Sequence, residues 1–272
     1  MIYSITNIND KNIKNIFKDL GFIVLKNVIL PETIKQILTE ANQLIDNSLI
    51  NDPNFYLEDS VVVPHQKLLR RVEKISDYCS VNKITYSDLI RDFLNYLMDE
   101  DYILFKDKLN LKLPGGSGFR PHVDGHYYWV DHNYIRKKGW LEYGNNFINV
   151  VIPLEDSTIH NGCLEICPQK YTKKYLGDSW EEITNNLGVK NGLFIKENDL
   201  QKFPMINIEM LPGDIAFFSW LNVHGSKNNL SNQSRKIIYA TYSPKSCGDN
   251  RDLHVYDKIH SKQTLEEKMV IK

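Results

Sequence analysis

The segment between residues 102 and 243 is a succession of short β-like runs separated by turn residues, and this pattern restricts the fold more than any other feature. Glycine stands where turns need a positive φ, at residues 114–118, in Asn161-Gly162 and in Pro212-Gly-Asp214. About eight strands of regular spacing predict a double-sheet jelly roll. The candidate strands are Ile103–Phe105, Leu109–Leu113, Arg120–Val123, Phe147–Leu154, Cys163–Ile166, Leu193–Ile195, Ile206–Glu209, Ile215–Ser219 and Lys236–Tyr242.

Apolar residues recur at helical spacing before residue 100. The pattern predicts helices over residues 9–20, which Gly21 ends, over about 31–48, which Pro31 begins, and over 86–99. A strand is expected at Phe22–Leu25 and a further short helix at Ser179–Asn186. If the early helices brace one of the two sheets, the fold class is α+β, a double-stranded β-helix (jelly roll, cupin-like) core braced by N-terminal helices.

We expect a single domain over residues 1–272. It would comprise a helical part (1–100), the jelly-roll core (about 102–243) and a C-terminal tail (244–272), because no linker, repeat or low-complexity tract divides the chain. Residues 49–66 contain two prolines and show no sustained period, so they are expected to form a loop over the active site. Two insertions, 130–146 and 170–202, are candidates for substrate loops.

Composition excludes several classes of partner. The formal charge is -1, from 33 basic and 34 acidic residues without a basic stripe, so we expect neither nucleic acid nor an anionic membrane as partner. No apolar run is long enough to span a membrane, and no secretory signal is recognisable. Four cysteines are too few for a disulfide scaffold. We therefore expect a cytoplasmic monomer or small homo-oligomer.

Two short stretches about a hundred residues apart contain candidate metal ligands. His122 and Asp124 stand two residues apart at the end of a predicted strand, so their side chains point to the same side. His224 follows a later strand. Two imidazoles and one carboxylate form the facial set that leaves positions open on non-haem Fe(II). Zinc is the competing ion, but the helical His-Glu-x-x-His pattern of hydrolytic zinc sites is absent.

Arg235 begins the last candidate strand, eleven residues after His224. A guanidinium fixed inside a barrel binds a carboxylate through two parallel hydrogen bonds. A lone arginine at a strand start is more often on the surface, so this residue gains meaning only together with the metal ligands.

Four stretches in this order resemble the phytanoyl-CoA dioxygenase family of Fe(II)- and 2-oxoglutarate-dependent oxygenases, and the resemblance extends over about residues 20–243. They are Asn110-Leu-Lys-Leu-Pro-Gly115 leading into His122-Val-Asp124, Val151-Ile-Pro-Leu-Glu-Asp156, Asn161-Gly-Cys-Leu-Glu-Ile-Cys-Pro168, and Gly213-Asp-Ile-Ala-Phe-Phe218 continuing through His224-Gly-Ser226 to Arg235. One departure is Pro168-Gln-Lys-Tyr171, where many members read Pro-Gly-Ser-His.

The resemblance implies an iron site and a co-substrate site. Iron would be held by His122, Asp124 and His224, and the distal carboxylate of 2-oxoglutarate by Arg235. Asn110 matches a co-substrate contact in related ectoine hydroxylases, and Lys112 is a weaker candidate. With O2 as second co-substrate, the expected reaction is hydroxylation of an unactivated C–H bond with release of succinate and CO2. Because a carboxylate occupies the third ligand position, halogenation is disfavoured.

The expected substrate is a free small molecule, a specialised metabolite or an amino-acid-like compound. An acyl-CoA or carrier-bound substrate is the alternative. A free small molecule is favoured over it because no basic tract suits the coenzyme A phosphates. A non-catalytic metal-binding sensor and a zinc hydrolase also stay open. Aromatic rings with polar tips would wall the pocket, and the candidates are Tyr56, His126, Tyr128, Trp129 and Trp220. His65 is a candidate for binding an acidic group of the substrate.

Overall fold

The computed structural model describes residues 4–5, 12–46, 52–187 and 194–261. Two sheets face each other across the core. The larger has eight strands in the order β1-β2-β12-β9-β14-β5-β4-β3, and the smaller has four, β11-β10-β13-β6. The strands are β1 (Ser4–Ile5), β2 (Phe22–Leu25), β3 (Phe55–Asp59), β4 (Lys67–Glu73), β5 (Tyr102–Lys112), β6 (Phe119–His122), β7 (Trp129–Val130), β8 (Arg136–Lys137), β9 (Ile148–Pro153), β10 (Leu164–Ile166), β11 (Ile206–Ile208), β12 (Ile215–Ser219), β13 (His224–Ser226) and β14 (Arg235–Pro244).

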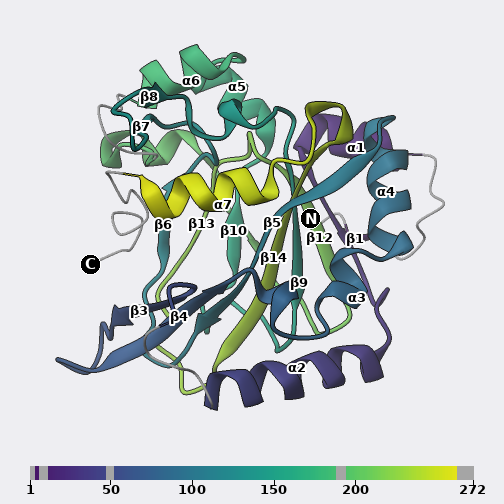
Figure 1. The fold of residues 1–272 in the computed structure, drawn as a ribbon, viewed down its shortest axis with the longest axis vertical. Helices are drawn as coiled ribbons and strands as arrows, with labels where there is room; N and C mark the ends of the chain where they lie inside the picture. The colour runs from purple at the N-terminus through teal and green to yellow at the C-terminus, as the bar shows by residue number, and fades with distance from the viewer. Residues whose placement is uncertain (1–3, 6–11, 47–51, 188–193, 262–272) are drawn as a thin grey trace.

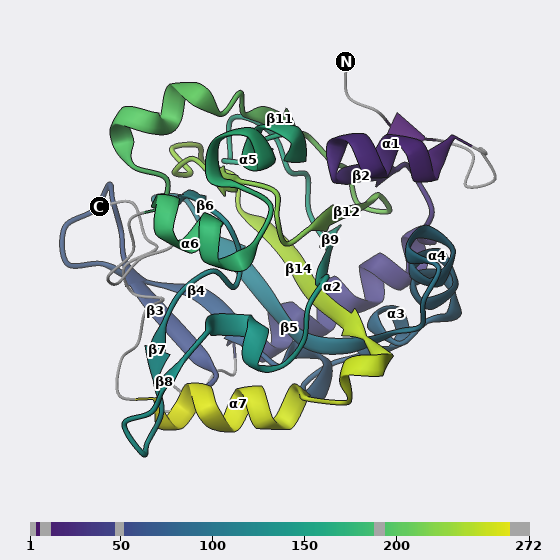
Figure 2. The same ribbon diagram turned by 90° about the horizontal axis from the view of Figure 1, so that it is seen from above.

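Helices gather on the outer face of the large sheet and around the mouth of the sandwich (Figures 1 and 2). Gly21 ends the first helix in the left-handed region, with φ of 75°, and its N–H donates to the Phe17 carbonyl. Ser87 caps the fourth helix by accepting from the Ile90 N–H. The helices are α1 (Ile13–Leu20), α2 (Pro31–Asp46), α3 (Asn82–Thr85), α4 (Asp88–Met98), α5 (Gln169–Leu176), α6 (Trp180–Leu187) and α7 (Arg251–His260).

The large sheet is buried on both faces, as its strand β2 illustrates. Ile23 and Leu25 pack with the helices, whereas Phe22 and Val24 pack in the layer between the two sheets. Alternation along a strand sends successive side chains to opposite faces, so a strand covered on both sides is apolar throughout. The predicted α+β fold with a jelly-roll core and bracing helices is confirmed.

One strand in the structure replaces two in the prediction. β5 runs unbroken over eleven residues, although the sequence suggested separate strands around residues 103–105 and 109–113. Lys106 and Lys108 interrupt the apolar pattern because they project from the inner face of the sheet while remaining half-buried. Two charged residues on the inner face therefore resembled a break between two strands.

The segment 49–66, expected to be an irregular loop, contains a strand. Its residues 55–59 form β3, which pairs with β4 and extends the large sheet. Arg70 pairs with Glu58 across the two strands and Arg71 pairs with Glu73 along β4, and of these side chains Glu58, Arg70 and Arg71 are buried. Because these buried positions are charged, neither strand shows the apolar alternation that sequence patterns detect.

Three helices were also missed, the one-turn α3 and two longer ones. α5 begins directly after Pro168, and α7 lies in the region expected to be a tail. α7 has few buried apolar residues and is held by polar contacts: Arg251 donates to Asp107 and Asp77, each at 3.0 Å. Periodicity could not reveal such a helix. The short helix expected at 179–186 is present as α6, whereas Leu193 of the predicted strand 193–195 lies outside the described residues. Across the described ranges, no helix has the length and apolar character needed to cross a membrane.

Candidate active site

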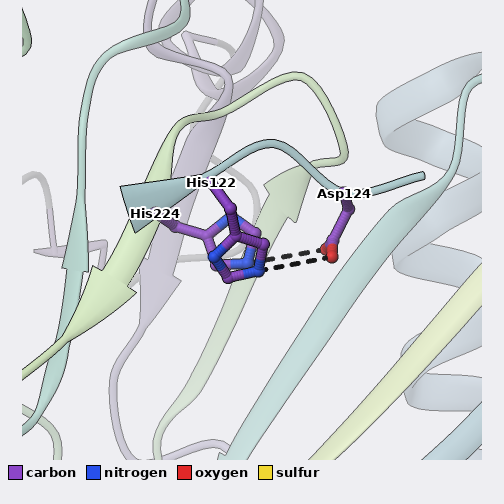
Figure 3. Close-up of side chains that lie close together, drawn as sticks. All are labelled: His122, Asp124 and His224. Carbon is purple, nitrogen blue, oxygen red and sulfur yellow. Dashed lines mark ion pairs between the residues drawn. The ribbon is translucent and has the colours of Figure 1, made fainter. Parts of the chain in front are cut away.

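Two side chains from the small sheet and one from the turn after β6 come together between the sheets. His122 ends β6 and lies directly opposite His224, the first residue of β13, in the antiparallel register. Asp124 follows two residues after His122. Its Oδ1 lies 3.7 Å from His122 Nε2, and its Oδ2 lies 3.6 Å from His224 Nε2. Figure 3 shows both imidazole rings facing the carboxylate. The structure thus brings together the three residues that the sequence singled out.

Both imidazoles are held in the tautomer that suits a metal ligand. Nδ1 of His122 lies 2.8 Å from the Arg120 carbonyl oxygen, and Nδ1 of His224 lies 2.9 Å from the Asn222 carbonyl oxygen. A carbonyl oxygen only accepts, so each Nδ1 carries the hydrogen and each Nε2 presents its lone pair. These lone pairs and the carboxylate oxygens lie within 4.8 Å of one another. These ligand atoms, and the backbone carbonyls that orient the two imidazoles, fit a divalent transition metal.

Burial sets the protonation of this cluster. It lowers the pKa of His122 to about 3, helped by the neighbouring His224. Burial opposes ionisation of Asp124, but His224, His122 and the lysines Lys106 and Lys108 outweigh it and lower the pKa of this carboxyl. At neutral pH the site therefore consists of a neutral His122 and an ionised Asp124, the forms that bind metals.

The metal-free protein should lose stability as the pH falls below about 6.5. Burial lowers the pKa of His122 to about 3 and that of His126 to about 4, so the unfolded chain takes up protons before the folded chain does. The stability is fully present above the pKa of an exposed imidazole and is lost progressively towards these lower values. Urea unfolding at pH 7 and pH 5 should differ by on the order of 2 kcal/mol for each histidine. A protein that is more stable at pH 5 would contradict this expectation.

The turn after Asp124 depends on Gly125. Its φ is +71°, and a Cβ there would lie 2.9 Å from the Trp140 Cβ. The Gly125 carbonyl also accepts hydrogen bonds from the Trp140 N–H and the Trp180 Nε1–H, each at 3.2 Å. The tight turn thus fixes Asp124 against an aromatic wall.

Gly125→Ala should destabilise the protein by about 2–4 kcal/mol, because a left-handed backbone and a steric clash add together. Gly248→Ala is the matched control, since Gly248 has φ of +85° but its nearest neighbour would lie 3.9 Å from the new Cβ. That control has backbone strain without the clash and should lose about 1–3 kcal/mol. Urea unfolding of both variants measures the difference, and equal losses would show that crowding against Trp140 is unimportant.

A buried pair of cations lies further along the inner face. Arg235 begins β14 and Lys112 ends β5, directly opposite in register, and both are about 1% exposed. Arg235 Nη1 donates to the Gly162 carbonyl, while its Nε has no partner among the described residues. Lys112 Nζ donates to Ser226 Oγ at 2.7 Å, to the Lys227 carbonyl at 2.5 Å and to the Gly162 carbonyl at 3.2 Å.

These contacts show that the two cations differ in their capacity to bind a ligand. The three donors of Lys112 are all used within the protein, where they tie the end of β13 to the connection between β9 and β10, so this residue is poorly suited to binding a ligand. Arg235 retains unused donors, and no ion pair to it occurs within the described ranges. An uncompensated guanidinium at this depth calls for an anion. Asn110, two residues before Lys112, is also buried, and its Oδ1 has no partner in the described part of the chain.

Most of the expected substrate aromatics form a packed cluster beside the metal ligands. Trp129 and Trp220 are buried in it, and His126, which is fully buried, donates from Nδ1 to the Asp124 carbonyl and lies 4.7 Å from the Trp220 ring. Tyr128 is half-buried and packs edge-on against Trp180. The cluster packs beside the turn that contains Asp124, so its buried members contribute to the site by packing against that turn.

Two candidates lie elsewhere. Tyr56 is half-buried and lines a groove beneath α7 together with Lys106, His254 and Lys258. His65 is exposed on the connection between β3 and β4, with φ of 63°, and the structure does not bring it to the ligands. Sequence reasoning missed Asn149, whose Nδ2 donates to Asp124 Oδ2 at 2.8 Å. An asparagine within an otherwise apolar strand was the available signal.

The family model for phytanoyl-CoA dioxygenase matches residues 17–237, a range that includes every residue of this site. The chain belongs to the phytanoyl-CoA dioxygenase family. It is thus an iron- and 2-oxoglutarate-dependent dioxygenase, as the resemblance predicted.

Relatives within and around this family act on small molecules. Methylphosphonate hydroxylase of Gimesia maris is 30% identical over 186 residues, which are 68% of this chain and 62% of that protein. A 2-aminoethylphosphonate dioxygenase from an uncultured bacterium is 26% identical over 90% of this chain and 86% of its own. Among solved structures, EctD of S. alaskensis with 2-oxoglutarate and 5-hydroxyectoine has a TM-score of 0.63 at 16% identity, covering 88% of this chain and 77% of that one. The last likeness concerns the fold.

Proposed function

We propose that this dioxygenase hydroxylates a C–H bond of a free, small, anionic molecule. His122, Asp124 and His224 would hold the iron, and Arg235 would bind the distal carboxylate of 2-oxoglutarate. The observation that supports the iron site best is that the two Nε2 atoms and the Asp124 carboxylate oxygens lie close together around one point. The same inner layer contains the Arg235 guanidinium, which is buried without a counter-ion among the described residues. Asn110 is a further candidate contact for the co-substrate, because its buried amide belongs to β5, the strand that pairs with Arg235's strand β14.

The division of labour follows from the chemistry of each group. Iron and 2-oxoglutarate, when bound, couple the reduction of O2 to the conversion of 2-oxoglutarate into succinate and CO2, with one oxygen atom inserted into the substrate C–H bond. The backbone carbonyls of Arg120 and Asn222 keep the imidazoles oriented. Arg235 aligns the diacid, and the aromatic cluster excludes water behind Asp124.

An anionic substrate is supported by two lysines of β5. Lys106 and Lys108 lie near enough to lower the pKa of Asp124 through their charge, and Lys108 also acts on His122. Lys106 lies 3.8 Å above the centre of the Trp140 ring, which holds its ammonium group at the edge of the aromatic cluster. A positive potential beside the reacting centre favours an anion. The names methylphosphonate hydroxylase and 2-aminoethylphosphonate dioxygenase make small phosphonates the first compounds to test.

The test is succinate formation from 2-oxoglutarate with Fe(II), ascorbate and O2. We expect methylphosphonate or 2-aminoethylphosphonate to increase succinate release, and a hydroxylated product to incorporate one atom from 18O2. Lack of succinate in every condition would contradict oxygenase function and favour a metal-binding sensor. Product formation without O2 would instead indicate a zinc hydrolase. Coupling to an acyl-CoA but to no free anion would overturn the substrate class alone.

A further inference from the structure

The carboxylate of Asp124 is held from behind by two polar side chains in series. Asn149 Nδ2 donates to Asp124 Oδ2 at 2.8 Å, and Thr241 Oγ1 donates to Asn149 Oδ1 at 2.7 Å. Asn149 is 4% exposed and Thr241 is 2% exposed. Both belong to central strands of the large sheet. This sheet contributes no proposed iron ligand itself but positions Asp124, which follows β6.

The order of donors in this series is fixed by chemistry. Asn149 on β9 and Thr241 on β14 are direct partners in the antiparallel register, so their side chains emerge side by side on the inner face. If the amide were reversed, its oxygen would face the ionised Asp124 carboxylate and repel it. The carboxylate only accepts, so it selects the orientation in which the amide NH2 faces Asp124, and the Thr241 hydroxyl holds the amide in place by donating to Asn149 Oδ1.

The two carboxylate oxygens of Asp124 are consequently unequal. Oδ2 receives the Asn149 hydrogen bond, whereas no hydrogen bond to Oδ1 is found in the described part of the chain. We propose that Asn149, oriented by Thr241, reserves Oδ2 and so makes Asp124 a ligand through Oδ1 alone. Asn149 and Thr241 are positioning residues in this proposal, which rests on the proposed function of the site.

The distinction matters because a six-coordinate metal has few positions to spare. Two imidazoles, a co-substrate that chelates through two atoms and a carboxylate that bound through both oxygens would fill all six. No position would stay available for O2. A single-oxygen contact from Asp124 leaves one position open, and the hydrogen bond from Asn149 opposes the movement that would close it.

Asn149→Leu removes the donor at similar size, Thr241→Val removes the hydroxyl that orients it, and Thr241→Ser retains that hydroxyl as the matched control. Each full-length protein is loaded anaerobically with Mn(II) and 2-oxoglutarate, and the relaxation rate of water protons reports water bound directly to the metal. We expect the wild type and Thr241→Ser to enhance relaxation equally. Asn149→Leu should lose the part due to metal-bound water, and Thr241→Val should lose some of it.

Metal affinity and turnover complete the test. Mn(II) should bind Asn149→Leu within about threefold of wild type, because its three ligands are intact, while 2-oxoglutarate turnover falls about 10- to 100-fold. Equal water relaxation and turnover in all four proteins would overturn the proposal. If Asn149→Leu does not fold, the Thr241 pair decides alone. Failure of the wild type to bind Mn(II) or turn over 2-oxoglutarate would refute the proposed function instead.

Discussion

Replacing His224 with alanine should abolish iron binding and 2-oxoglutarate turnover. The change leaves one imidazole and one carboxylate, which no longer form the facial set of three. Loss of a group that orients a ligand typically costs 10- to 100-fold in metal affinity or activity, so loss of a ligand itself should lower metal affinity by more than about 100-fold. Anaerobic titration with Fe(II) and 2-oxoglutarate measures this loss, because the chelate of the two absorbs weakly in the visible range.

His160→Ala is the control for this variant, since His160 is exposed and distant in sequence from the ligands. It should bind iron as the wild type does. His224 also packs against Phe218, with ring centres 4.7 Å apart, so unfolding of the metal-free proteins must be compared. A His224→Ala protein that is folded and still forms the visible chelate would remove His224 from the ligand set.

The core strands could be predicted because both the turns and the apolar runs are local signals. β9 and β12, at the centre of the large sheet, are apolar at nearly every position, and the glycines at 162 and 213 adopt the positive φ that their turns imply. His122 and Asp124 could be paired because alternation along a strand fixes their direction. The prediction that His224 lies close to these two residues needed the family resemblance, because neither segment alone determines how the two strands pair.

Other features depend on contacts between distant residues. The strands β3 and β4 show no apolar alternation, because ion-paired charged residues occupy buried positions in them. The helix α7 attaches through Arg251 to carboxylates far away in sequence. Asn149 and Thr241 are unremarkable polar residues until the sheet register places them behind Asp124. The family resemblance made Lys112 a weaker candidate for contacting 2-oxoglutarate, yet two carbonyl oxygens and one hydroxyl oxygen already occupy its donors. Hydrogen-bond saturation of this kind cannot be read from a sequence.

Arg235→Met should weaken binding of 2-oxoglutarate while leaving iron binding intact. Removal of one partner from a buried charge pair costs about 2–4 kcal/mol, which is roughly a 30- to 1,000-fold rise in the KM for 2-oxoglutarate. Iron affinity should stay unchanged, because the guanidinium bonds to the Gly162 carbonyl and not to any ligand. Steady-state turnover at varied 2-oxoglutarate and the Fe(II) titration measure the two effects separately.

The same substitution should make the ligand-free protein more stable, which distinguishes a binding role from a structural one. The guanidinium is buried without a counter-ion among the described residues, so an apolar side chain of similar length removes a desolvation cost and should add about 1 kcal/mol or more to the free energy of unfolding. The Gly162 carbonyl stays satisfied by Lys112. Lys236→Met is the control on the same strand, because Lys236 pairs with Glu155 at 2.7 Å and should leave the KM unchanged. A less stable Arg235→Met protein with an unaltered KM would make this arginine part of the scaffold and leave the co-substrate without its anchor.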